Sequence, residues 1–335
     1  MKVAAFTGGV TVPSARFRVR QYIPALQSQG IDVEEFGHSG GDNHPPATKW
    51  RRPAWGLTRT AGLAGDIWRS RNHDCVLLQR EMISSFKTLE GWTGKPRVFD
   101  VDDSIHFFRG GRAARRIAQI SDRVIAGNSF LADWYSQWNN DVVILPTAVD
   151  DDRYCPAPEM PRKSTVVGWI GSSSNFVYLD AIQPALSRVL QMYPQAHLRV
   201  IADCPPALDL IPPSRWSFSN WRADQEIAEI QNMAIGIMPL LDTILARGKC
   251  SFKMLQYMSC GIPVVVSPVG MNASVLGMGT IGLGASSADD WVDALGALIT
   301  SPNTRASMGL AGRDVICRSF SVRSLALELA KHLSL

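Results

Sequence analysis

Short apolar runs rich in β-branched residues alternate along the chain with longer amphipathic segments, and this alternation occurs twice. The pattern is typical of a parallel sheet flanked by helices, so we expect an α/β fold with one doubly wound, Rossmann-like sheet in each half. In the first half, strands are expected over residues 2–6, 32–36, 75–79, 97–101, 123–126 and 142–145, with helices over 19–29, 112–121 and 129–137. In the second half, strands are expected over residues 165–170, 197–202, 216–218, 235–239, 263–266 and 280–283, with helices over 179–192, 224–232, 251–259, 289–300, 304–318 and 324–333.

A proline-rich segment over residues 154–164 separates the two series and marks a linker. A chain of 335 residues also exceeds the roughly 100–200 residues usual for one domain. We therefore expect an N-terminal domain over 1–153 and a C-terminal domain over 165–318. Two such domains create a cleft, and the loops at the carboxyl ends of the strands are where ligands of these sheets bind.

The segment over residues 248–270 carries the clearest chemical pattern. We expect Ser251 to cap the helix that follows it and Gly261 to take the left-handed conformation that ends this helix. Lys249 and Lys253 add two ammonium groups to the helix N-terminus, whose N–H groups suit a diphosphate.

Gln256 lies one turn deeper in this helix and is expected to hydrogen-bond a ribose. Gly171 and Ser172 follow the first strand of the second half, so they are expected at the same ligand edge. These residues complete the candidate donor site.

The net charge of +4 arises entirely from the first half, where residues 1–150 hold 19 Lys and Arg against 15 Asp and Glu. Residues 49–71 concentrate this charge among three tryptophans, with Asp66 as the one acid. The basic side chains are Lys49, Arg51, Arg52, Arg59, Arg69 and Arg71. This mixture favours an anionic membrane surface or a phosphate-bearing acceptor, and a solvated basic face over packed tryptophans stays open. No nucleic-acid-binding motif accompanies it.

No apolar run approaches the ~20 residues of a membrane span, and the first apolar run is too short for a signal peptide. We expect a cytoplasmic protein, with peripheral attachment to the inner face of the membrane as an open alternative. The cysteines lack the spacing of a disulfide framework or a zinc site, so no metal is expected. They are Cys75, Cys155, Cys204, Cys250, Cys260 and Cys317.

Residues 248–265 resemble the donor-binding segment of the GT-B glycosyltransferases of family 4, the group 1 transferases. Residues 15–22, 99–103, 125–129 and 237–240 fit the same family, which extends the resemblance over nearly the whole chain, although only the segment over 248–270 is specific. The resemblance implies a nucleotide-sugar donor on the C-terminal domain, an acceptor on the N-terminal domain, no required metal and retention of anomeric configuration. It also implies that residues 319–335 cross back to the first domain.

Two departures from the family pattern stand out. Many members carry paired glutamates where this chain has Gly248 and Gln256, and a basic pair where it has serines after Gly171. Lys249 and Lys253 are the expected substitutes for neutralising the diphosphate.

The loop after the first strand contains Gly8 and Gly9, followed by Ser14, Arg16 and Arg18. We expect these residues at the mouth of the cleft, in contact with acceptor or donor phosphate. An ordinary strand–helix turn with surface arginines is the alternative.

Asp102 and Asp103 end a strand and are the candidate catalytic carboxylates, able to orient or deprotonate an acceptor hydroxyl or to stabilise positive charge. Because family members often carry a histidine in this loop, His106 is a nearby alternative. Asn128 is expected to cap a helix, with substrate contact as the second interpretation.

Trp221 and Arg222 are expected to stack on or clamp a nucleotide base, and packing at a domain edge is the alternative for Trp221. The other histidines lack partners at metal or triad spacing and are interpreted as structural: His38, His44, His73, His197 and His332.

We expect a retaining, metal-independent and cofactor-free transfer of a hexose-type unit from a nucleoside-diphosphate sugar to a glycan or lipid-linked glycan. Three alternatives stay open. They are a nucleotide-sugar epimerase of the same architecture, a manganese-dependent enzyme of the other glycosyltransferase fold, and a non-catalytic nucleotide-binding or scaffold subunit.

Overall fold

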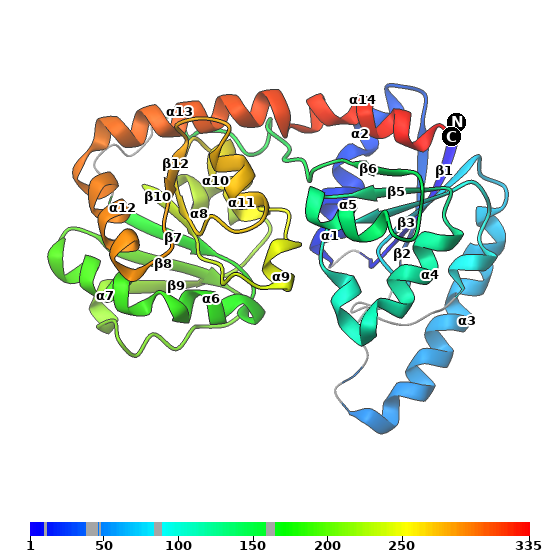
Figure 1. Cartoon of the computed structure of the whole chain (residues 1–335), viewed down its shortest axis with the longest axis horizontal. Coiled ribbons are helices and arrows are strands. Elements are labelled where there is room, and N and C mark those ends of the chain that lie inside the picture. The colour runs from blue at the N-terminus through cyan, green and yellow to red at the C-terminus, as the bar shows by residue number, and fades with distance from the viewer. Residues whose placement is uncertain (10–11, 38–45, 47, 84–88, 159–164) are drawn as a thin grey trace. The chain divides into compact units, whose positions relative to one another are not determined.

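The computed structural model describes residues 1–9, 12–37, 46, 48–83, 89–158 and 165–335. The chain divides into two compact units. The first comprises Met1–Ala148, Gly248–Cys250 and Val322–Leu335, and the second comprises Val149–Arg247 and Ser251–Ser321. Within the described residues, each unit contains a six-stranded parallel sheet with flanking helices (Figure 1). The expected α/β fold with two doubly wound sheets is confirmed.

The first sheet has the strand order β2-β1-β3-β4-β5-β6. Its strands are β1 (Lys2–Thr7), β2 (Asp32–Gly37), β3 (Cys75–Gln79), β4 (Arg97–Val101), β5 (Arg123–Ala126) and β6 (Val142–Ile144). All six strands expected from the sequence are present, with ends within one residue. Because β2 and β3 lie on opposite sides of β1, the topological switch point falls between β1 and β3.

The helices of the first unit are α1 (Pro13–Arg18), α2 (Ile23–Gln27), α3 (Arg52–Ser70), α4 (Arg112–Ile120), α5 (Ser129–Tyr135) and α14 (Val322–Leu333), with 3-10 turns η1 (Arg20–Tyr22), η2 (Lys49–Arg51), η3 (Glu90–Trp92) and η4 (Ile105–Gly111). The helix expected over 19–29 is present over residues 20–27 as η1 and α2, whereas α1, which Val19 separates from η1, was not expected. Pro13 and Pro24 each stand in the first turn of a separate helix, where proline is favoured. The 19-residue helix α3 was not expected at all.

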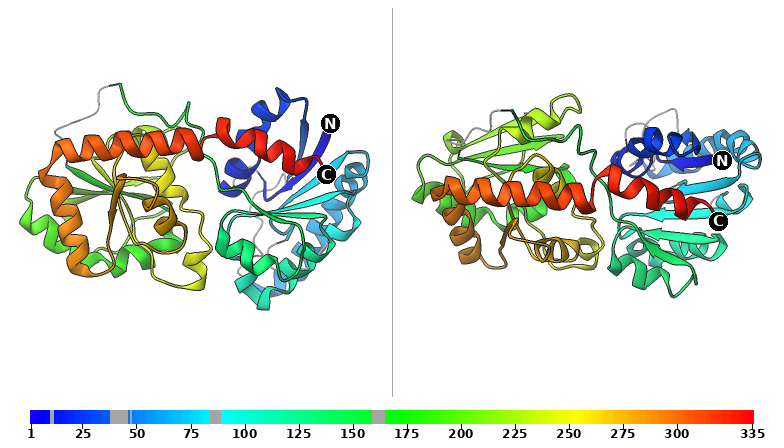
Figure 2. Two further views of the ribbon diagram at one scale, coloured as in Figure 1. Left: turned by 45° about the horizontal axis from the view of Figure 1, so that its top comes forward. Right: turned by 90° about the horizontal axis from the view of Figure 1, so that it is seen from above.

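One buried core of the first unit lies between the central strands and helices α2 and α14. Val3, Leu77 and Ile125 from the sheet belong to one buried cluster with Leu26 of α2 and Leu329 of α14. The helix α14 lies against α2, as both views in Figure 2 show. The last helix of the chain is therefore part of the first unit.

The second sheet has the order β12-β11-β10-β7-β8-β9. Its strands are β7 (Val166–Ile170), β8 (His197–Ala202), β9 (Trp216–Asn220), β10 (Ile235–Met238), β11 (Val264–Val266) and β12 (Gly282–Gly284). Since β8 and β10 flank β7 on opposite sides, the switch point of this sheet lies between β7 and β10.

The helices of the second unit are α6 (Phe176–Ala181), α7 (Gln183–Met192), α8 (Glu226–Gln231), α9 (Ile244–Arg247), α10 (Phe252–Ser259), α11 (Met271–Leu276), α12 (Ala288–Thr300) and α13 (Pro302–Ser319), with 3-10 turns η5 (Ser173–Asn175) and η6 (Pro213–Arg215). The helix expected over 179–192 divides at Ile182, and proline stands in the first turn of α7. Helices α9 and α11 lie where loops were expected.

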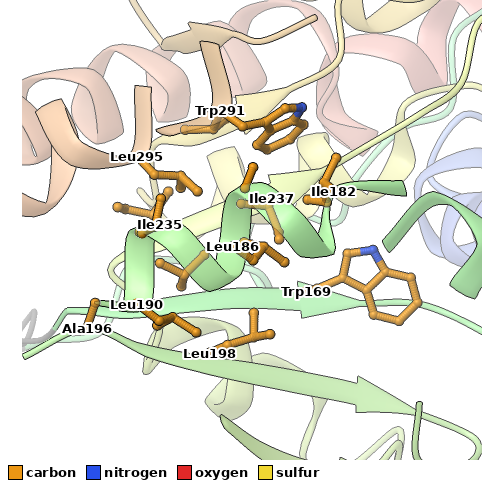
Figure 3. Close-up of a cluster of buried hydrophobic side chains, with 14 of the residues drawn as sticks. Trp169, Ile182, Leu186, Leu190, Ala196, Leu198, Ile235, Ile237, Trp291 and Leu295 are labelled. Carbon is orange, nitrogen blue, oxygen red and sulfur yellow. The ribbon is translucent and has the colours of Figure 1, made fainter. Parts of the chain in front are cut away.

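Helices α7 and α12 pack together over one face of the second sheet. Leu186 of α7 and Leu295 of α12 meet Leu198, Ile235 and Ile237 of the strands in one buried cluster (Figure 3). This core fixes the strands whose carboxyl ends carry the candidate donor site. In the described part of the chain, no helix combines the length and apolar character needed to cross a bilayer.

Candidate functional site

The carboxyl ends of β7 and β10 form the ligand edge of the second unit, because ligands of open α/β sheets bind at the switch point. The turn that begins at Gly171 follows β7, while β10 leads through α9 toward the start of α10. Gly171, Ser172 and the first turn of α10 therefore follow the two strands that define this edge.

The turn after β7 is held in one conformation. A Cβ atom on Gly171 would lie 2.3 Å from the indole of Trp169, so a larger residue would displace that ring. The backbone N and the hydroxyl of Ser173 each donate to the Asp203 carboxylate at 2.6 Å. These hydrogen bonds lower the pKa of Asp203. Ser172 is exposed on the same turn.

The expectation that the Ser251 side chain caps α10 is wrong. Ser251 has a φ of 52° and its hydroxyl donates to Oδ1 of Asn272 at 2.6 Å. The Asn272 amide in turn donates to the carbonyl of Ser267 at 3.1 Å. The left-handed backbone thus turns Ser251 into the interior, where it fixes the start of α10. At the other end, Gly261 has a φ of 71°, which confirms the expected left-handed residue.

Lys253 is the charged residue of α10, and it lies in the first turn. Lys253 and Phe252 are half-buried, whereas the rest of the helix is buried. The first N–H groups of a helix have no partner in its own i→i−4 pattern and carry partial positive charge. The ammonium group and the helix terminus therefore reinforce each other as an anion site.

Gln256 lies in the interior of the second unit, not on an open side of the helix as expected from the sequence. The side chain is fully buried, and its Nε2 donates to Oε1 of Glu226 at 3.1 Å. Its Oε1 has no hydrogen-bond partner among the described residues. Gln256 does not offer an exposed contact to a ribose in this conformation.

Glu226 was missed by the sequence analysis and organises the neighbourhood of Gln256. It is 3% exposed and also accepts hydrogen bonds from the Tyr154 hydroxyl at 2.6 Å and the Trp221 indole at 3.1 Å. Two of these donors, Tyr154 and Gln256, lie 72 and 30 residues away in the sequence, so local spacing does not reveal the cluster. The hydrogen bond to Glu226 fixes Trp221, which is still 42% exposed. Arg222 is exposed and forms an ion pair with Asp224.

In the first unit, the loop after β1 lies at the switch point with β3. Gly9 has a φ of 102°, and its N–H donates to the Thr7 hydroxyl at 3.2 Å. A Cβ on Gly8 would lie 2.9 Å from the Val12 side chain. The buried Ser14 hydroxyl donates to Gln79 of β3 at 3.3 Å. Ser14 therefore links the start of α1 to the end of β3 at this edge.

Arg16 is half-buried, with its guanidinium 4.7 Å from the centre of the Phe17 ring. Arg18, in contrast, was expected at the mouth of the cleft, and this expectation is wrong. Its side chain is buried, with only 3% exposed. Its Nε donates to both oxygens of the buried Asp100 at 3.1 and 3.0 Å, and its Nη1 donates to the carbonyl of Leu145 at 2.8 Å. Arg18 and Asp100 therefore hold α1 on the sheet and do not meet solvent.

Arg80 was also missed, and it controls the two candidate catalytic carboxylates. Its Nε donates to Oδ1 of Asp102 at 2.6 Å, and its Nη2 lies 3.7 Å from Oδ2 of Asp103. Burial opposes ionisation of Asp102, but the charge and hydrogen bond of Arg80 outweigh it and lower the pKa. Asp102 is a poor proton acceptor as a result. Asp103 is more exposed, and its Oδ1 accepts from the Ser104 N–H at 2.9 Å.

His106 is a packed side chain in η4. It is 8% exposed and stacks on Trp134 with ring centres 4.5 Å apart, and burial lowers its pKa. Among the histidines interpreted as structural, His73 contacts Glu34 and His197 contacts Ser217, at 3.0 and 2.9 Å. His332 accepts from Arg123 through its backbone carbonyl. His38 and His44, like residues 159–164 of the linker, lie outside the described residues.

Asn128 caps α5 as expected, because its Oδ1 accepts from the Leu131 N–H at 2.9 Å. Its Nδ2 donates to the carbonyls of Gly248 and Lys249 at 3.1 and 3.2 Å, within the first unit. Both the oxygen and the nitrogen of the Asn128 side-chain amide therefore have hydrogen-bond partners within the protein. The assignment of Asn128 to substrate contact is not supported by this arrangement.

Gly248 has a steric reason for departing from the family pattern. A Cβ there would lie 1.8 Å from the Ser104 hydroxyl and 3.1 Å from the Ser104 nitrogen. Beside it, the Cys250 thiol donates to the carbonyl of Asp102 at 3.2 Å. A glutamate at this position would displace the loop that carries the two aspartates. Over the described ranges, no group of three or more His, Cys, Asp or Glu side chains is placed to hold a metal ion.

The family comparison agrees with this architecture. Residues 164–301 match the family model of the group 1 glycosyl transferases. The matched segment contains all six strands of the second sheet, including the edge formed by β7, β10 and α10. It ends before helix α13. Residues 164–301 thus form a domain of the group 1 glycosyl transferase type. No curated protein matches the chain significantly.

Solved structures support the fold over the full length. The Anabaena protein Alr3699/HepE, solved with UDP and glucose, is 15% identical with a TM-score of 0.74, covering 100% of this chain and 99% of that one. Sucrose-phosphate synthase from Thermosynechococcus elongatus is 14% identical with a TM-score of 0.69, covering 99% and 98%. WaaG, a glycosyltransferase of lipopolysaccharide biosynthesis, is 13% identical with a TM-score of 0.68, covering 99% of both chains.

Proposed function

We propose that this chain transfers a hexose-type sugar from a nucleoside-diphosphate sugar to a glycan or lipid-linked glycan, with retention of configuration and without a metal ion. The observation that carries the proposal is the start of α10, where Lys253 and the helix terminus supply positive charge at the switch edge of the group 1 domain. A diphosphate matches that charge. The solved structure of Alr3699/HepE with UDP-glucose favours a uridine nucleotide.

The proposal assigns the donor to the second unit. Lys253 and the first turn of α10 bind the diphosphate, with the Gly171–Ser172 turn following the neighbouring strand of the same edge. The exposed Trp221 ring offers a stacking surface for the base, fixed by its hydrogen bond to Glu226. Because an ammonium group and a helix terminus stabilise the developing charge on the leaving diphosphate, a metal ion is not required for that task.

The acceptor is assigned to the first unit. Asp103 is the carboxylate available to orient the acceptor hydroxyl, since it is the more exposed of the pair. Asp102, held ionised by Arg80, supplies a fixed negative charge beside Asp103 at the same edge of the first sheet. The reaction forms one glycosidic bond, breaks the bond between the sugar and the diphosphate, and moves the acceptor proton to a base or to the leaving diphosphate.

Product analysis by NMR tests this function. The full chain is incubated with UDP-glucose and a panel of soluble and lipid-linked glycans, with and without a chelator. We expect UDP release and a new glycoside with the anomeric configuration of the donor, unaffected by the chelator. An isomerised nucleotide sugar formed without acceptor would instead identify an epimerase, and loss of activity with the chelator would contradict metal independence. Nucleotide binding without turnover of any donor or acceptor would identify a non-catalytic subunit.

A further inference from the structure

The helix α3 has an apolar stripe on the side that faces solvent. Within α3, Ala54, Leu57, Ala61, Ala64 and Trp68 recur every three or four residues, and all are exposed. This spacing places them on one face of a helix. Leu57 is 73% exposed and Trp68 is 68% exposed.

The side of α3 that packs on the first unit is a different one. It is formed by Leu63, Ile67 and Ser70, the buried residues of the helix, and all three lie in its second half. The first half of α3 has no fully buried residue and extends beyond the neighbouring elements of the unit (Figure 1). The outward stripe is therefore apolar surface that folding of the unit does not cover, and such surface marks an interaction site.

Tryptophan and arginine side chains stand at both ends of this stripe. At the start, the Arg51 guanidinium lies 5.1 Å from the centre of the Trp50 ring, which is 75% exposed. At the end, Arg71 lies 5.2 Å from the Trp68 ring and donates to the carbonyl of Trp92, whose side chain is 66% exposed. Exposed tryptophans beside arginines are suited to the boundary between lipid headgroups and acyl chains.

The charge of this segment indicates whether a membrane or a second copy of the chain binds the outward stripe. Residues 49–71 contain six basic residues and one acidic residue. Two copies pairing through this stripe would bring like charges together, whereas an anionic lipid surface neutralises them. We propose that the outward face of α3, defined by the five stripe residues with Trp50 and Trp92, docks in the plane of an anionic phospholipid bilayer.

Vesicle sedimentation of the full chain tests this proposal independently of sugar transfer. We expect binding to phosphatidylcholine vesicles that contain phosphatidylglycerol, weaker binding at high salt, and little binding to pure phosphatidylcholine. Leu57→Glu should abolish binding. Leu310→Glu, at a 70% exposed leucine of α13 in the second unit, should leave it unchanged. Thermal melting confirms that both variants remain folded.

The arginines are tested separately. Arg51→Gln should weaken binding to anionic vesicles roughly fivefold, because one basic side chain near the surface is lost. Arg318→Gln, at an exposed arginine of α13, is the matched control. Equal binding to anionic and neutral vesicles, or no difference between Leu57→Glu and Leu310→Glu, would overturn the proposal. A dimer in solution that Leu57→Glu dissociates would overturn it in favour of a second copy of this chain.

Discussion

Arg80 and Asp102 form an ion pair at the carboxyl edge of the first sheet, with Nε of the arginine 2.6 Å from Oδ1 of the aspartate. Arg80 adopts a φ of 60°, and its N–H donates to the carbonyl of Asp100. The backbone conformation thus holds the guanidinium of Arg80, which follows β3, against Asp102, which follows β4. The pKa of Asp102 is lowered by this pair, so the carboxylate is ionised at neutral pH.

Replacing Arg80 by glutamine should lower the free energy of unfolding by about 1.5–3 kcal/mol at neutral pH, because Asp102 loses its charged partner. The folded-state pKa of Asp102 is below its usual value of 3.8, so the pair stabilises the fold above that value and the contribution is lost as the pH falls further. Urea denaturation should show a similar difference between wild type and Arg80→Gln near neutral pH and near pH 5, shrinking toward about pH 3. A difference that instead grows on acidification would contradict this assignment.

Arg18 and Asp100 should act as a structural pair. Because both are about 3% exposed, removing one partner leaves a buried charge, and Asp100→Asn should destabilise the fold by about 3–5 kcal/mol. The double variant Arg18→Met, Asp100→Leu should recover much of that loss in a urea titration. If Arg18→Met alone were as stable as the wild type, the arginine would not have the structural role assigned here.

The sequence predicted the strands well, because buried parallel strands appear as short apolar runs. It did not reveal α3, since apolar residues occur on both its inward and outward faces and the usual single stripe is obscured. The Arg18–Asp100 pair joins residues 82 positions apart, and two donors to Glu226, Tyr154 and Gln256, lie 72 and 30 positions from it, so neither arrangement follows from local spacing. Ser251 was misjudged because its positive φ cannot be recognised in a residue that so often caps helices.

Gly248 should not tolerate a side chain. Gly248→Ala should destabilise the fold by about 1–3 kcal/mol, because the added methyl group meets the Ser104 hydroxyl. Adding Ser104→Gly should restore part of this loss, and chemical denaturation of the single and double variants measures it. Full stability of Gly248→Ala, or no coupling between the two positions, would show that this close approach does not exist in solution.

Glu226 should matter for both stability and nucleotide binding. Glu226→Gln weakens a buried acceptor of three hydrogen bonds, so we expect a loss of about 1.5–3 kcal/mol in the free energy of unfolding and weaker binding of UDP through a less fixed Trp221. Tyr154→Phe removes one donor and serves as the matched variant, with a loss of about 1 kcal/mol. Equal effects of the two substitutions would argue against a central role for the carboxylate.

The central claim is that the start of α10 binds the diphosphate of a sugar nucleotide through Lys253. Isothermal titration calorimetry with UDP tests it most directly, comparing the wild type with Lys253→Ala and with Lys331→Ala, a control at an exposed lysine of α14. Loss of a charge-assisted hydrogen bond should weaken UDP binding about tenfold or more in Lys253→Ala, with no change in Lys331→Ala. Unchanged affinity in Lys253→Ala, or no detectable UDP binding by the folded wild type, would contradict the account.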